Sequence, residues 1–359
     1  MFLFGGCILY QLLQLSPQVL KTKIKNTIIF QEKRKFILAL LLRSILLVLF
    51  SIFYILFFSS LFGKENNSVA VGSLCILLGI RFVSYGYKIK ESLLSLAIVL
   101  FLMFLGGIVS LLNSLWGVFV FNFLALLVIL LLVANRPIMG NAGIYTFSYL
   151  FIVETPVENK LILTRFLSLI FVFFICGLIL YLKHNKNDRD VCLFDIIRSW
   201  NIYNKNSIWQ VSLALGVSLA LFLGRAFHLS KTVWIGYACM SILLLYDNYK
   251  SKKQLFNRVV SRVLAVVIGS ILYGYVSSFI CEKYTFIIGP VAGLLLGLSG
   301  TYFWNNVLNC FGALLLASEI YGIEGSIYYR IENNIIGVAV AMIVFFVFRK
   351  LSYYLLNKS

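Results

Sequence analysis

Two stretches, PIMGNAGIYTFSYLFIVETPVENKLILTR at residues 137–165 and WNNVLNCFGALLLASEIYGIEGSIYYR at residues 304–330, carry Asn, Glu and Arg in the same order. The matching positions are separated by 165 residues in each case: Asn141 and Asn306, Glu154 and Glu319, Arg165 and Arg330. Charged residues are costly to place in or beside lipid, so a matched set in so apolar a chain predicts an internal duplication. The repeated unit is about half of the protein.

The composition identifies the class of protein. Hydrophobic residues make up 61% of the 359 positions and charged residues 12%, whereas soluble domains have roughly 45–50% and about 25%. The chain is therefore expected to be a polytopic membrane protein with the lipid bilayer as its surroundings. The net charge of +18 is consistent with basic residues that flank apolar spans. A nucleic-acid partner is not expected, because the sequence shows no basic face that would be free of lipid.

Apolar runs along the sequence predict an all-α fold of about twelve transmembrane helices. The predicted spans are residues 36–62, 69–86, 93–111, 116–134, 140–154, 162–182, 207–227, 231–247, 259–277, 284–301, 304–320 and 331–348. With both termini in the cytoplasm, 23 of the 31 Lys and Arg residues lie on the inner side or at its boundary, as the positive-inside rule requires. Six spans per half make the repeats parallel, and the chain is assigned to the cytoplasmic membrane.

Five segments follow from this topology. They are an interfacial and basic N-terminal segment (1–35), a first six-helix repeat (36–183), a cytoplasmic linker (184–206), a second six-helix repeat (207–350) and a cytoplasmic tail (351–359). Residues 2–20 are interpreted as an interfacial helix, although a truncated membrane span would look similar. Within the linker, residues 191–200 have apolar positions at helical spacing and predict a surface helix.

Residue patterns typical of enzymes are nearly absent. The two histidines, His184 and His228, fall in different regions, so neither a metal centre nor a His-based triad is expected. The chain has no phosphate-binding GxxxxGK[ST] loop, and its seven cysteines show no CxxC spacing. We therefore expect no enzyme activity and no cofactor, and a transport process driven by a gradient or membrane potential.

The fifth and eleventh spans are the best candidates for a substrate path. Short or polar-interrupted helices at corresponding positions of two repeats are the strongest sequence indication of such a path, which places Asn141 and Asn306 on it. The acidic and basic residues that follow have two interpretations. In one interpretation the charges form ion pairs that clamp helical hairpins at the outer surface, and in the other they gate the path. The pairs are Glu154 with Arg165 and Glu319 with Arg330.

Two further residues have a functional and a plain interpretation. Arg262, at the cytoplasmic mouth of the ninth span, either attracts an anionic substrate through its planar guanidinium or anchors the helix to lipid phosphates. Trp304, beside the Asn-bearing helix, either stacks on an aromatic substrate or belongs to the interfacial aromatic belt.

Residues 208–348 resemble the fusaric acid resistance (FUSC) family, also known as the aromatic acid exporter-like family. The resemblance rests on the order of a helix ending near Arg225, Thr232-Val-Trp234, a basic loop, Arg262 to Gly269, Tyr302-Phe-Trp-Asn-Asn and Arg330 to Gly337. Ala265 and Val266 stand where the family has glycine and threonine, and Glu332-Asn333 replaces its usual Asp-Thr. The resemblance implies an efflux protein of the cytoplasmic membrane, with Trp234 as a further candidate on the path.

The predicted function is the export of small organic anions, with aromatic carboxylates as candidates, along a path between the repeats. Two alternatives remain: a passive anion channel, as in related plant proteins, and a membrane protein of envelope polysaccharide assembly. The last would need a large outer loop bearing His, Arg or Asp, and every predicted outer connection is short. The substrate, the coupling ion and the oligomeric state, including a homo-oligomer, are left open.

Overall fold

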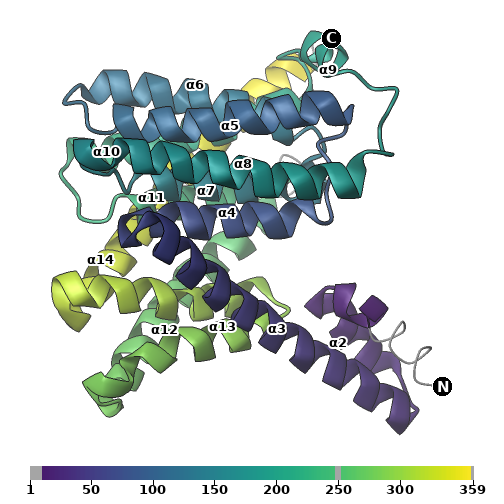
Figure 1. The fold of residues 1–359 in the computed structure, drawn as a ribbon. Helices are drawn as coiled ribbons and strands as arrows, with labels where there is room; N and C mark the ends of the chain where they lie inside the picture. The colour runs from purple at the N-terminus through teal and green to yellow at the C-terminus, as the bar shows by residue number, and fades with distance from the viewer. Residues whose placement is uncertain (1–9, 247–251, 357–359) are drawn as a thin grey trace. The chain divides into compact units, whose positions relative to one another are not determined.

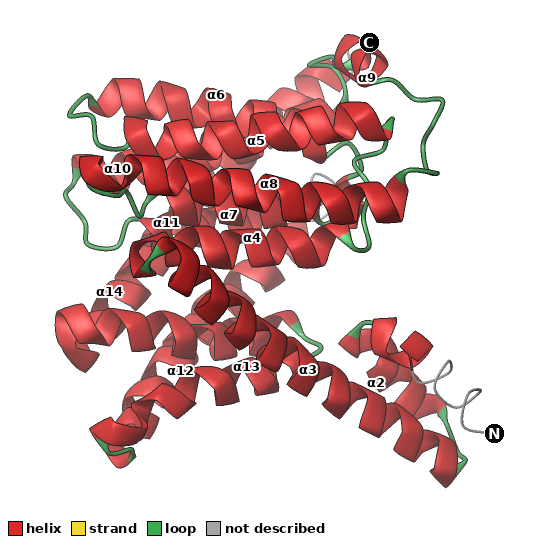
Figure 2. Cartoon of the chain, viewed as in Figure 1, coloured by secondary structure: helices red, strands yellow, loops and turns green. Residues whose placement is uncertain are grey.

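The computed structural model describes residues 10–246 and 252–356, and throughout these ranges the regular structure is helical (Figure 2). The apolar segments predicted from the sequence all fall on helices (Figure 1). Their bounds are α2 Pro17–Asn26, α3 Phe30–Phe62, α4 Asn67–Ile80, α5 Ile89–Val109, α6 Leu115–Val133, α7 Asn141–Val153, α8 Ile162–His184, α9 Leu193–Ser199, α10 Lys205–Ala226, α11 Val233–Leu243, α12 Lys252–Phe279, α13 Ile288–Leu298 and α14 Tyr302–Leu356. Short 3-10 turns lie at Lys64–Asn66, Pro137–Met139, Asn159–Leu161 and Glu282–Ile287.

The last two predicted spans lie on one continuous element, α14. It is interrupted at Gly322, whose φ of 70° and ψ of 171° are not helical. Glycine adopts a positive φ without the steric penalty that a Cβ atom brings. The chain therefore bends at this residue and separates a helical part at 302–321 from one at 323–356.

The protein is a multi-pass membrane protein with helices of two length classes. Seven helices of the described chain are long and apolar enough to cross a membrane. Asn141–Val153, Val233–Leu243 and Lys283–Leu298 are apolar but shorter. At 1.5 Å per residue, a helix of 13 residues such as α7 reaches about 20 Å, less than the hydrocarbon thickness of roughly 30 Å. The short helices at predicted spans five and eight are thus too short on their own to cross the hydrocarbon layer.

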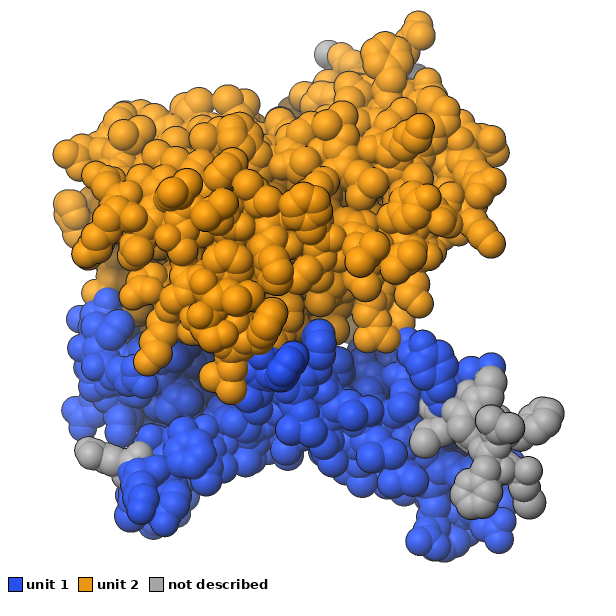
Figure 3. All heavy atoms as spheres, viewed as in Figure 1, with its two compact units in different colours: residues 1–53, 259–332 blue, residues 54–258, 333–359 orange. Residues whose placement is uncertain are grey.

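The helices group into two compact units (Figure 3). The first unit contains residues 1–53 and 259–332, and the second unit contains residues 54–258 and 333–359. The chain passes from one unit to the other within α3, α12 and α14. Each unit therefore draws on both halves of the sequence, and its boundaries differ from those of the predicted repeats.

The second unit is built around α10. In the most apolar window of this helix 72% of the residues are buried, against 17% for α3. Its polar side chains find partners inside the unit: Trp209 Nε1 donates to Leu243 O at 2.9 Å, and Gln210 Nε2 donates to Leu130 O at 3.1 Å. Polar groups in an apolar interior need such partners, because an unpaired donor costs about 1–3 kcal/mol. These bonds fix α10 between α6 and α11.

One end of the second unit joins connections that the sequence assigns to the cytoplasmic side. Ser84 Oγ and Arg136 Nη2 donate to the two carboxylate oxygens of Asp188 at 2.8 and 2.6 Å, and His184 Nε2 lies 2.7 Å from Ile80 O. Burial alone would raise the pKa of Asp188, but the hydrogen bonds from Ser84 and Arg136 outweigh it and lower the pKa. The linker is thereby tied to the α4–α5 and α6–α7 connections, and its surface helix, predicted at 191–200, is present as α9.

The N-terminal segment packs as a short helical layer of the first unit. Ser16 accepts a bond from Val19 N and caps α2, which carries Lys21, Lys23 and Lys25. The apolar side of α2 is held by Leu20, which is buried against α3. Residues 1–9, which contain half of the predicted interfacial helix, lie outside the described residues.

Candidate functional site

A partly buried ion pair lies at the end of the second unit opposite Asp188. Glu154, the C-cap residue of α7, accepts a bond from Arg225 Nη2 at 2.7 Å, and the side chains are 8% and 20% exposed. Thr232 Oγ1 donates to the other carboxylate oxygen of Glu154, and Arg225 Nη1 donates to Ser110 O at 3.1 Å. The cluster joins α7 from the first half of the sequence to α10 and the α10–α11 connection from the second. We call these four residues the Glu154 clasp.

The clasp corrects the sequence prediction that Glu154 pairs with Arg165. The two side chains have different partners: Glu154 contacts Arg225, whereas Arg165 contacts the α3–α4 connection. The partner of Glu154 could not be read from the repeat, since Arg225 lies outside the repeated stretch and no spacing rule links the two positions.

Arg165 is a buried arginine that hydrogen-bonds uncharged oxygens. It is 3% exposed and lies in the first turn of α8. Its Nε donates to Asn66 Oδ1 at 2.6 Å, its Nη2 to Glu65 O at 2.9 Å, and Nη1 and Nη2 both reach Thr155 O at 3.3 Å. The side chain thus joins the connection before α4 to the connection before α8.

An equivalent contact occurs in the second half of the sequence. Asn333 Nδ2 donates to Ser230 O at 2.6 Å and to Lys231 O at 3.2 Å. The displacement of 165 positions that relates the repeated stretches takes Glu65 to Ser230 and Asn66 to Lys231. In both halves, then, the last helix holds the connection that precedes the second helix, although Asn333 lies one turn beyond the position equivalent to Arg165.

The structure places the two members of the predicted Glu319–Arg330 pair in different surroundings, and their pairing stays a prediction. Glu319 is exposed, whereas Arg330 is 6% exposed. The interruption at Gly322 redirects the chain between the two residues. Glu319 therefore stays on the surface of the first unit, while Arg330 turns inward.

Arg262 is the centre of a buried polar cluster in the first unit. The residue is 8% exposed, and its Nη1 donates to Asn306 Oδ1. Tyr302 is a second side-chain partner, and Arg330 lies close enough for its charge to repel that of Arg262. Asn306 is fixed in turn, since its Nδ2 donates to Tyr302 O at 2.7 Å. We call Arg262, Tyr302, Asn306 and Arg330 the Arg262 cluster.

Close helix packing explains two glycines of the family motifs. A Cβ atom on Gly269 would lie 2.6 Å from Val307 O, and one on Gly337 would lie 2.3 Å from Ile235 O. Contacts under 3.0 Å force a neighbour to move, and a backbone carbonyl inside a helix cannot do so easily. Gly269 thus permits the approach of α12 to α14 that brings Arg262 to Asn306.

The remaining predicted path residues lie in separate places. Asn141 is 4% exposed and its Nδ2 donates to Val133 O at 3.0 Å, which ties the start of α7 to the end of α6. Trp234 is buried in the second unit at 6% exposure, whereas Trp304 in the first unit is 53% exposed. Trp304 packs edge-on against Phe303 with 5.5 Å between ring centroids.

Sequence reasoning missed Arg225, Thr232 and Ser110 as members of the Glu154 clasp, and Asn66 as the partner of Arg165. Arg225 and Thr232 belong to the segments that resemble the family, and this resemblance was the available signal for them. Nothing in the sequence indicated that their partner is Glu154. Asn66 carries no sequence signal. Across the described part of the chain, no group of three or more His, Cys, Asp and Glu residues could hold a metal ion.

A comparison with protein families supports the resemblance seen in the sequence. Residues 219–344 match the family model described as fusaric acid resistance protein-like. The matched segment contains the whole Arg262 cluster together with Arg225, Thr232 and Asn333. No curated protein and no solved structure matches the chain. Residues 219–344 are thus similar to the fusaric acid resistance protein-like family.

Proposed function

We propose that this fusaric acid resistance protein-like membrane protein exports small organic carboxylate anions, aromatic ones among them, and that the Arg262 cluster binds the anion. The observation that carries the proposal is a buried guanidinium held by a neutral amide, with a second guanidinium nearby, in the matched segment. Export driven by a gradient fits a chain in which no nucleotide-binding loop occurs.

The electrostatics of the cluster favour an anion. Like charges in an apolar interior repel strongly because the local dielectric constant is low. A carboxylate placed beside Arg262 and Arg330 would relieve that repulsion, and a guanidinium can bind both carboxylate oxygens at once. The Asn306 amide orients the Arg262 side chain through an uncharged acceptor, so this hydrogen bond does not itself neutralise the guanidinium.

The proposed architecture is twelve spans in two parallel six-helix repeats, with both termini in the cytoplasm. The contacts of Arg165 and Asn333 support the repeats. Arg165 donates to Glu65 O and Asn333 donates to Ser230 O, and these two acceptors are separated by the same 165 positions that relate the repeated stretches. Helix packing agrees: α5 meets α7 near Gly106 and Tyr149, and α12 meets α14 near Gly269 and Val307.

The test is transport by purified protein in proteoliposomes loaded with a panel of carboxylates that includes benzoate-like and aliphatic members. Arg262→Lys keeps the charge but loses the planar fork, so one charge-assisted hydrogen bond worth about 1.5–3 kcal/mol is lost. That loss corresponds to a decrease of about 10- to 100-fold in the initial rate. The exposed Arg189→Lys, made in the linker, is the matched control.

The same variant separates transport from lipid anchoring. An anchoring arginine needs only a long cation, so lysine would serve equally well. If Arg262→Lys inserts normally and moves every carboxylate at the wild-type rate, the assignment of Arg262 as the anion site is wrong. A current that follows the membrane potential and does not saturate with carboxylate would indicate a channel in place of an exporter.

A further inference from the structure

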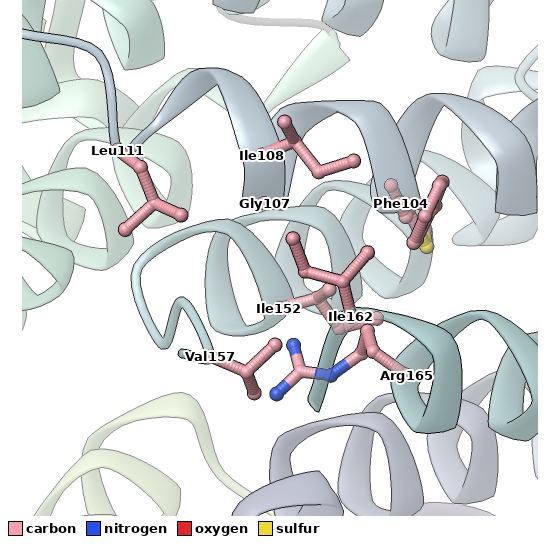
Figure 4. Close-up of a pocket in the computed structure, with 9 residues that line it drawn as sticks. Phe104, Gly107, Ile108, Leu111, Ile152, Val157, Ile162 and Arg165 are labelled. Carbon is pink, nitrogen blue, oxygen red and sulfur yellow. The ribbon is translucent and has the colours of Figure 1, made fainter. Parts of the chain in front are cut away.

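Arg165 borders a small apolar pocket between α5, α7 and α8 of the second unit (Figure 4). The other walls are apolar side chains and a glycine: Met103, Phe104, Gly107, Ile108, Leu111, Ile152, Val157 and Ile162. The Arg165 guanidinium points toward Val157, beneath Ile152 and Ile162 (Figure 4). The pocket offers about 10 Å³ to the centre of a water-sized sphere, which is room for about one such particle.

The charge of Arg165 is unbalanced in this surrounding. Among the described residues no Asp or Glu side chain forms an ion pair with it, and its hydrogen-bond acceptors are one amide and two backbone carbonyls. A guanidinium has five N–H groups, and these contacts use four of them. One Nη1 hydrogen is left over. A cation that is 97% buried beside apolar walls is costly without a counter-charge.

We propose that this pocket binds a halide-sized monovalent anion, chloride in an ordinary salt solution, against the free Nη1 hydrogen of Arg165. The pocket's size restricts the ligand to a single small particle, and its lining provides no acceptor or second cation that would select a larger polar ligand. The first turn of α8 adds the positive end of a helix dipole to the guanidinium charge.

The bound anion has a structural consequence. Arg165 holds the connections before α4 and before α8 together, and an anion at its remaining hydrogen would neutralise the charge that makes this arrangement costly. The site lies in the second unit, apart from the Arg262 cluster, and the inference does not depend on what the protein transports. Its ligand is also chemically distinct, because a benzoate-sized carboxylate exceeds the available space.

The experiment measures thermal unfolding of the purified protein in detergent, in sodium chloride and in sodium gluconate at the same ionic strength. A ligand that binds only the folded state raises the midpoint in a saturable manner. We expect chloride and bromide to raise it by roughly 1–3 °C relative to gluconate, and Arg165→Gln to abolish the difference. Equal midpoints in chloride and gluconate for the wild-type protein would overturn the proposal and leave a water molecule as the occupant.

A second variant keeps the test decisive if Arg165→Gln does not fold. Gly107 lines the pocket, and no atom lies within 4 Å of a Cβ built on it, so Gly107→Leu adds bulk at the pocket without a clash at Cβ while Arg165 stays intact. Gly312→Leu is the matched control, because its Cβ position is also open and it lies on α14. The chloride effect should disappear in Gly107→Leu and persist in Gly312→Leu. Persistence of the effect in Gly107→Leu would show that chloride acts elsewhere.

Discussion

Breaking the Glu154 clasp should destabilise the protein more than breaking an exposed ion pair of the same length. Glu154 and Arg225 are joined at 2.7 Å with 8% and 20% of their side chains exposed. Hydrogen bonds to charged groups contribute about 1.5–3 kcal/mol, and removing one partner of a buried pair leaves the other charge desolvated. We expect each single variant, Glu154→Gln and Arg225→Gln, to lose about 2–4 kcal/mol, with a coupling energy of about 1.5–3 kcal/mol in the double-mutant cycle.

The chain offers an internal control for this cycle. Glu158 and Lys160 also pair at 2.7 Å, but their side chains are 70% and 75% exposed, and exposed pairs contribute about 0.2–1 kcal/mol. Both cycles are measured by reversible unfolding in mixed detergent, followed by tryptophan fluorescence. A Glu154–Arg225 coupling no larger than that of Glu158–Lys160 would mean that the clasp is not formed in the folded protein.

Three further outcomes are expected. Gly337→Ala should lower the free energy of unfolding by about 1–3 kcal/mol or more through over-packing, because its Cβ would lie 2.3 Å from Ile235 O. Gly312→Ala has open space around its Cβ and should be neutral or stabilising. Equal unfolding midpoints for the two variants would contradict the close helix contact. Asn333→Ala should lose about 1–3 kcal/mol from its two hydrogen bonds, and an unchanged unfolding midpoint would argue against them. Asp188 has a lowered pKa in the folded state, so its ionised form stabilises the protein at neutral pH, and this contribution is lost as pH falls below about 4. Asp188→Asn should therefore lose less stability in acid than the wild-type protein. An equal loss of stability in acid for both proteins would refute this prediction.

The apolar segments were predictable because burial in lipid imposes a length and a composition that a sequence displays directly. Even the surface helix α9 in the linker could be found from its periodicity. The exact course of α14 could not, because the interruption at Gly322 depends on one residue's φ, and glycine leaves φ unspecified.

The polar contacts were harder to predict than the helices. The repeated stretch identified Glu154 and Arg165 as important but gave them each other as partners, since they are neighbours in sequence. Their true partners, Arg225 and Asn66, come from segments 71 and 99 residues away, and only helix packing determines such pairs. Arg262 and Asn306 were both named beforehand, whereas their contact depends on the close approach of α12 and α14 at Gly269.

Asn306→Asp tests the central claim most directly, because it places a carboxylate beside Arg262 with almost no change of shape. The new charge would occupy the guanidinium that we assign to the substrate. The contact with Arg262 would become an ion pair, which offsets the loss of the Asn306 Nδ2 hydrogen bond to Tyr302 O and retains the fold. We predict at least a tenfold loss of carboxylate transport in proteoliposomes with an unfolding midpoint equal to or above that of the wild-type protein. Asn309→Asp, the same change at an exposed position one turn along α14, should transport normally. Wild-type transport by a stably folded Asn306→Asp protein would contradict the account.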